Sequence, residues 1–149
     1  MEAVSARSLV DPVFFARLSS RVASVNGLEL DKAEVITDQA LAYLATSAQK
    51  QEGAPSFFMC TTVDPAWHAF LEYTREYDAF FNRPGWHKVH HNPCDVPGVD
   101  YGDPNATIPQ TISAIERAGY VVLRGLWSGD LTCGDDGGGG NPLPCGDHG

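Results

Sequence analysis

Apolar residues recur at helical spacing in four stretches of the chain, and typical helix-start and helix-stop residues bound them. The first stretch follows Asp11-Pro12, a capping residue and a first-turn proline, and ends at Asn26-Gly27. Its apolar positions lie three or four residues apart, which predicts a helix with one face in the core. These positions are Val10, Phe14, Phe15, Leu18, Val22 and Val25.

Two further stretches predict amphipathic helices on either side of the middle of the chain. Asp31 with Glu34 three residues later has the spacing of a capping box, and the helix it starts fades before Gly53-Ala54-Pro55. The later helix starts near Thr107 and closes at Ala118-Gly119. The apolar stripe of the helix that starts at Asp31 is Ile36, Ala40, Leu41 and Leu44, and that of the helix near Thr107 is Ile108, Ile112 and Ile115.

The remaining stretch is the most aromatic part of the chain. It begins with a second Asp-Pro pair, Asp64-Pro65, in which Asp64 is the expected cap. A buried aromatic side chain removes about 150–250 Å² from water, so we expect this helix to be the central one. Its apolar positions are Trp67, Phe70, Leu71, Thr74, Tyr77, Phe80 and Phe81.

Segments without helical periodicity complete the predicted fold. Short apolar runs at 57–60 and 120–123 indicate extended segments packed against the helices. From Cys133 the chain is dominated by Gly and Asp, and such a segment cannot bury a core. We predict a mainly α fold: one domain of about four helices over residues 1–132, followed by a flexible Gly-rich C-terminal tail over residues 133–149.

Size, charge and cysteine content narrow the class of protein. A chain of 149 residues that is 43% hydrophobic can bury one core of ordinary size. The net charge of −9 argues against binding to nucleic acid through phosphates. No apolar run approaches the roughly 20 residues that cross a bilayer, and the N-terminus lacks a signal-peptide pattern. We therefore expect a cytoplasmic protein with no membrane partner, whose cysteines are thiols or metal ligands rather than disulfides.

A histidine cluster is the main candidate for chemistry. Four of the five histidines lie between positions 68 and 91. Neutral imidazoles and thiolates bind divalent zinc, iron and copper, and three or four ligands suffice. Three ligands and an open position suit a catalytic site, whereas four suit a structural one. The favoured ligands are His68 on the third helix with His90 and His91 in the following loop; His87 and Cys94 come next.

Three other residues are expected to support the cluster. Asp64 can cap the helix or orient an imidazole, Trp67 anchors the helix in the core, and Tyr77 lies on the same stripe. Adjacent histidines such as His90 and His91 seldom bind one metal ion together, because an extended chain directs them to opposite faces. Structural histidines without a metal, and acid–base catalysis without a metal, both remain open.

The tail offers a separate candidate. Cys133 and Cys145, together with His148, could bind a metal ion or become oxidised. The glycine run between the two cysteines makes a preformed site unfavourable unless a metal ion is bound.

The central motif also resembles a known family. The segment from Val63 to Tyr77, followed by Val89 to Pro93, is similar to the core of glycine-rich domain-containing proteins, including their small bacterial and actinobacterial members. That family shares an Asp, a Trp-His pair, a helix with a Tyr and a later His-His-Pro-like element. The resemblance covers roughly residues 57–127 and implies a small helical domain without an established substrate. Here Asn92 separates the histidine pair from Pro93, and His87 and Cys94 are additions.

Three functions are compatible with these patterns. The first is a small metal-binding protein, or a metalloenzyme, that uses the histidine cluster. The alternative is a non-catalytic interaction domain in which the histidines are structural and an aromatic surface around Tyr73, Tyr77 and Trp86 meets a protein partner. The third is an accessory protein that binds a small molecule or peptide between the third helix and the loop that carries His87, His90 and His91, here named the histidine loop.

Overall fold

A computed structural model of the chain describes residues 2–51, 54, 57–93, 104–127 and 131–134. Within these residues the fold is mainly α, as predicted, with a small three-stranded sheet. The α-helices are α1 (Pro12–Asn26), α2 (Leu30–Ala48), α3 (Asp64–Glu72), α4 (Thr74–Phe80) and α5 (Pro104–Arg117). Two short 3₁₀ helices are η1 (Ala6–Leu9) and η2 (Arg124–Leu126), and the strands are β1 (Phe58–Cys60), β2 (Asn92–Pro93) and β3 (Leu131–Gly134).

Helix α1 follows its sequence signals closely. The Asp11 carboxylate accepts hydrogen bonds from the backbone N–H groups of Val13 and Phe14, and Gly27 ends the helix at a φ of 63°. The predicted apolar face is buried except at Val10, which is half-buried before the helix starts, and at Val25, which is 63% exposed. Helical periodicity puts Val25 on the same face as Phe14 and Leu18, so its exposure comes from its place in the last turn of the helix, which ends at Asn26.

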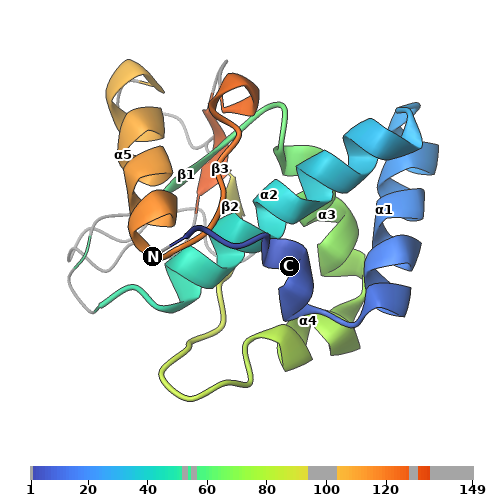
Figure 1. The fold of residues 1–149 in the computed structure, drawn as a ribbon, viewed down its shortest axis with the longest axis horizontal. Helices are drawn as coiled ribbons and strands as arrows, with labels where there is room; N and C mark the ends of the chain where they lie inside the picture. Colours follow the sequence, from blue (N-terminus) through green and yellow to red (C-terminus); the bar gives the residue numbers. More distant parts are fainter. Residues whose placement is uncertain (1, 52–53, 55–56, 94–103, 128–130, 135–149) are drawn as a thin grey trace.

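The central helix is α2, and the prediction that the aromatic third helix would be central is wrong. Every residue from Ile36 to Ala48 is buried. Helices α1 and α3 pack on one side of α2 and α5 packs on the other (Figure 1). The alanines on α2 have small side chains, so neighbouring elements can approach its backbone closely from several directions. The predicted cap was also misplaced: the helix starts at Leu30, so Asp31 lies in its first turn rather than before it.

Burial on all sides forces polar residues of α2 to find partners inside the protein. The Gln39 side chain donates to the backbone carbonyl of Val121 and accepts from Leu123 N–H and from the Trp127 indole, each at 3.0 Å. These bonds hold the segment after α5 against the middle of α2. A parallel β-bridge between Val4 and Tyr120 also joins this segment to the start of the chain.

The aromatic stretch forms two helices rather than the one continuous helix that was expected. Tyr73 breaks the helix with a ψ of 70°, and α4 continues beyond it. Asp64 is the first residue of α3, and the cap position is held by Val63, so the expected role of Asp64 as cap is wrong. The fourth predicted helix, α5, starts three residues before Thr107, at Pro104.

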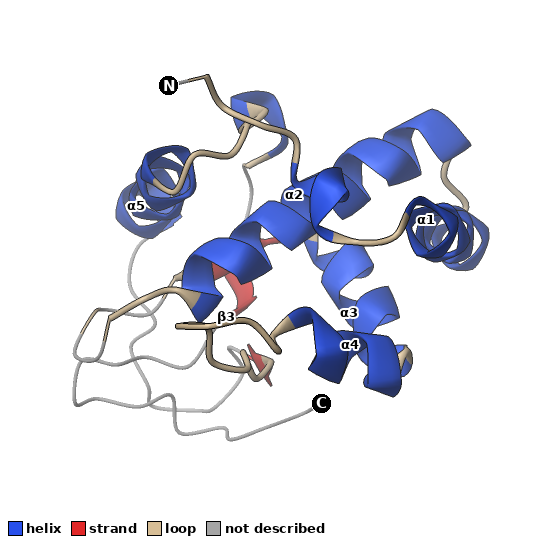
Figure 2. Ribbon diagram, turned by 60° about the horizontal axis from the view of Figure 1, so that its bottom comes forward, coloured by secondary structure: helices blue, strands red, loops and turns tan. Residues whose placement is uncertain are grey.

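The sheet joins three segments that are far apart in sequence. Strand β3 lies between β1 and β2 and pairs with both in antiparallel register (Figure 2). The run at 57–60 is thus a paired strand, whose partner could not be identified from nearby sequence. Strand β3 reaches Gly134, two residues into the predicted tail; the rest of that tail lies outside the described residues.

Replacing Gln39 tests its role in the fold. We expect Gln39→Leu to lower the free energy of unfolding by about 3 kcal/mol, because each buried group left without a partner costs roughly 1–3 kcal/mol. Urea denaturation measures the change. The exposed Gln110 provides the control, since Gln110→Leu should change stability by less than about 0.5 kcal/mol. Equal effects of the two substitutions would contradict the role of Gln39.

Deleting β3 tests whether this strand protects the backbone amides of β1 from exchange. Removal of residues 131–149 should increase amide hydrogen exchange at Met59 and Cys60, because β1 loses its strand partner. Removal of residues 135–149 keeps β3 and serves as the matched control. The same exchange rates in both truncated chains would show that β3 does not protect β1.

Candidate metal centre

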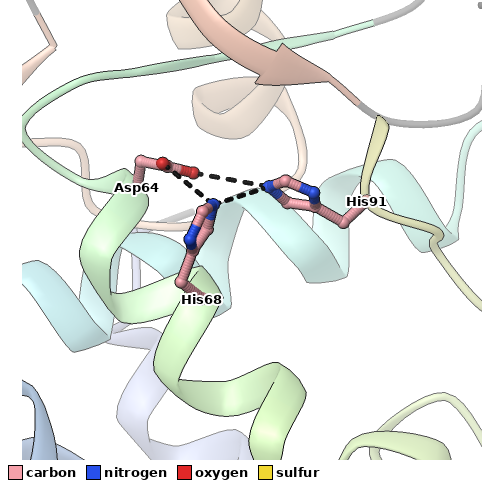
Figure 3. Close-up of side chains that lie close together, drawn as sticks. All are labelled: Asp64, His68 and His91. Carbon is pink, nitrogen blue, oxygen red and sulfur yellow. Dashed lines mark hydrogen bonds and ion pairs between the residues drawn. The ribbon is translucent and has the colours of Figure 1, made fainter. Parts of the chain in front are cut away.

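Three side chains from two separate segments converge beside the sheet (Figure 3). Asp64 and His68 come from α3, and His91 comes from the loop immediately before β2. One donor atom from each lies within 4.8 Å of the other two. Among the described residues, these three form the one cluster of His, Cys, Asp or Glu side chains with this geometry.

The helix itself aligns the first two residues. Asp64 and His68 are four positions apart on α3, so their side chains lie on one face, one turn apart. The Oδ2 atom of Asp64 is 3.1 Å from Nε2 of His68. The Asp64 carboxylate thus faces the imidazole. The hydrogen bond that the His68 ring donates to the Asp64 carboxylate raises the pKa of His68, and so does the charge of that carboxylate, while partial burial opposes the rise.

A chain of hydrogen bonds places the third residue. The buried Trp67 indole donates to the Tyr77 hydroxyl at 3.0 Å, and that hydroxyl donates to the Val89 carbonyl at 2.6 Å. The loop is also fixed at its start, where the backbone N–H of His87 donates to the Ala48 carbonyl at the end of α2. His91 follows Val89 by two residues, and its ring packs edge-on against Trp67 with 4.6 Å between ring centroids.

The distances between donor atoms are close to those around a bound metal ion. Ligand atoms about 2.0–2.1 Å from a zinc-sized ion lie about 2.8–3.4 Å apart in octahedral or tetrahedral geometry. Here the two Nε2 atoms of His68 and His91 are 2.9 Å apart and Asp64 Oδ2 is 3.1 Å from His68 Nε2, whereas Asp64 Oδ1 is 3.7 Å from His91 Nε2. One shared ion therefore requires an Asp64 oxygen to move closer to His91.

Electrostatics also fit a cation. Two imidazole nitrogens and a carboxylate face one another (Figure 3). All of these atoms carry lone pairs when His68 and His91 are neutral, and a metal ion can accept from all three. Coordination through Nε2 puts the His91 proton on Nδ1, which is buried and has no hydrogen-bond partner among the described residues.

Other candidate ligands from the sequence lie elsewhere. His87 is exposed, and its Nδ1 is 3.3 Å from the Lys88 carbonyl. His90 lines a cleft on the surface together with Leu71 of α3, Thr74 of α4 and Lys88. This cleft lies between the helices and the histidine loop, but His68 does not line it. Neither His87 nor His90 belongs to the cluster with His68.

Four sequence candidates cannot be placed within a site. Cys94, Cys145 and His148 lie outside the described residues. Cys133 lies in β3, where its backbone is described. The proposed site in the tail therefore stays a prediction.

The three aromatic residues expected to form an interaction surface are covered to different extents in the described part of the chain. Tyr77 is 3% exposed and occupied by the hydrogen bonds described above. Tyr73 and Trp86 are half-buried, and the guanidinium groups of Arg17 and Arg83 lie over their rings. The Tyr73 ring also packs edge-on against Phe14 of α1, and the Trp86 ring against Phe80 of α4.

No family model, curated protein or solved structure matched this chain in the three comparisons made. The resemblance to glycine-rich domain-containing proteins therefore stays a prediction from the motif. None of the helices in the described parts of the chain has both the length and the apolar character that crossing a bilayer requires.

The sequence analysis treated Asp64 as a cap or an orienting group, whereas the structure places its carboxylate within the cluster. The available signal was its spacing from His68, because an acidic residue and a histidine four apart on a helix share a face. The Asp-Pro pair masked that signal, since the same residues are typical of a helix start.

The contact between Asp64 and His68 predicts a pKa change in metal-free protein. Asp64→Asn should lower the pKa of His68, measured by NMR titration of its ring after chelation, because the carboxylate that favours the imidazolium is lost. The stability that this pair contributes is present below the pKa of an unfolded histidine. It is lost as the pH rises through the higher pKa of folded His68.

Asp78→Asn is the matched control for this titration, because Asp78 pairs with Lys88 on the surface. The pKa of His68 should stay unchanged in that variant. A pKa of His68 that is the same in both variants and in the unmodified protein would refute the contact with Asp64.

Proposed function

We propose that this chain is a metal-binding protein whose centre consists of Asp64, His68 and His91. The observation that carries the proposal is the convergence of three donor atoms within 4.8 Å of one another. Their arrangement is supported by rigid neighbours, because α3 provides two of them and the Trp67–Tyr77–Val89 hydrogen bonds place the third. Ligands fixed in this way bind an ion with little further loss of conformational entropy.

The donor set favours zinc or iron(II). Two imidazoles and one carboxylate with open positions are typical of catalytic zinc sites and of non-haem iron(II) sites. The three residues provide no sulfur ligand, which makes them a poorer match for copper(I). This centre differs from the sequence prediction in using Asp64 and in excluding His87 and His90.

A second function follows from the same contacts. A protonated His68 could hold Asp64 and His91 together without a metal ion, since its Nε2–H lies close to both. The triad would then lock α3 to the histidine loop and the protein would be a structural or interaction domain. This alternative predicts a folded protein whose stability is insensitive to chelators and to added zinc.

Metal binding by untagged protein separates the two functions. We expect elemental analysis and calorimetric titration of chelator-treated protein with zinc to show one ion per chain. His68→Ala should weaken zinc binding by at least about 100-fold, since loss of a residue that only hydrogen-bonds a metal ligand already costs about 10–100-fold. His91→Ala should do the same, but its buried position makes a circular dichroism check of folding necessary.

His87→Ala is the matched control, because His87 is an exposed histidine outside the cluster. It should bind zinc as the unmodified protein does. Unmodified protein that binds no zinc or iron(II) would overturn the metal proposal, as would equal affinity in the His68→Ala and His87→Ala variants.

A further inference from the structure

The three donor atoms are unequally exposed to solvent. The His91 side chain is 6% exposed and that of Asp64 is 14% exposed, whereas that of His68 is 56% exposed. Trp67 covers the His91 ring from the protein side. An ion held by the three residues would therefore have the protein interior on the side of His91 and solvent on the side of His68.

The number of donors leaves the coordination shell incomplete. Zinc takes four ligands and iron(II) commonly takes six, but among the described residues no fourth His, Cys, Asp or Glu joins the cluster. Three donors, one from each residue and all within 4.8 Å of one another, form a triangle that occupies one side of an ion. The remaining positions then lie on the opposite side of the ion from that triangle.

Charge decides which ligand suits those positions. A divalent ion carries two positive charges, the Asp64 carboxylate removes one, and neutral His68 and His91 remove none. The loaded centre thus has a net charge of about +1 in a half-buried place, where charges interact more strongly than in water. A small anion, or water that loses a proton to become hydroxide, neutralises this charge.

We propose, building on the metal centre of the preceding section, that the bound ion keeps an open position next to His68 and takes a small exogenous anion there. The ligand class is an oxygen- or nitrogen-donor anion such as a carboxylate or hydroxide. This property makes the centre one of the catalytic type, in which the ion contacts a substrate or an activated water, and not a closed structural site.

Cobalt(II) substitution tests the open position without an activity assay. Cobalt(II) replaces zinc in nitrogen and oxygen sites, and its visible absorption depends on the number and type of its ligands. We expect cobalt(II) to give a protein-bound visible spectrum in the unmodified protein and not in the His91→Ala variant. Absence of that spectrum from the unmodified protein would overturn the metal centre itself.

Azide then probes the open position in the cobalt(II)-loaded protein. Sodium azide should shift the visible spectrum in a saturable manner, because the anion enters the coordination shell. His87→Ala, loaded in the same way, should show the same shift and serves as the matched control. The His91→Ala variant with cobalt(II) should show only the response of the free ion in buffer.

Two results would overturn the open position while leaving the metal centre intact. One is a cobalt(II) spectrum that azide does not change. The other is an intense near-ultraviolet absorption typical of a thiolate bound to cobalt(II), since it would show that a cysteine completes the shell. In either case the ion is held by the protein but is closed to exogenous anions.

Discussion

The hydrogen-bonded chain from the Trp67 indole through the Tyr77 hydroxyl to the Val89 carbonyl is the constraint on which the arrangement of this protein depends. All three groups are buried, so each must be satisfied within the protein. These two hydrogen bonds connect α3, α4 and the histidine loop. Without them, the bend at Tyr73 would leave the three segments free to separate. Because Val89 precedes His91 by two residues, the same bonds that stabilise the fold set the position of an imidazole.

A second constraint comes from the complete burial of α2. Its alanines allow α1, α3 and α5 to approach closely, but its polar side chains must then replace the hydrogen bonds they would make with water. Asp38 accepts from the Ser5 hydroxyl and the Arg7 backbone, and Gln39 binds the segment after α5. The polar residues of α2 therefore join the first residues of the chain and the segment after α5 to the centre of the fold.

The candidate centre combines a local and a distant element. The helix places Asp64 beside His68 by its periodicity alone, and this pair exists wherever α3 forms. His91 joins it through the loop and β2, which is itself paired to β3 and through β3 to β1, the strand that precedes α3. The sheet thus links the two segments that carry the donor atoms, and His68, whose side chain is 56% exposed, leaves the cluster accessible from solvent.

The sequence alone determined the helical class, the limits of α1 and the concentration of chemistry between residues 68 and 91. These follow from local physics: helix periodicity, capping at Asp11 and the αL conformation of Gly27 act between residues close in the chain. Only the tertiary structure decided that α2 is central, that β1 pairs with β3, and that His91 rather than His90 meets His68. Each of these depends on contacts between distant segments. Because His90 and His91 are adjacent, a shift of the loop by one residue would exchange the ring that faces α3. The hydrogen bond from Tyr77 to Val89 holds the loop in the register in which His91 faces α3.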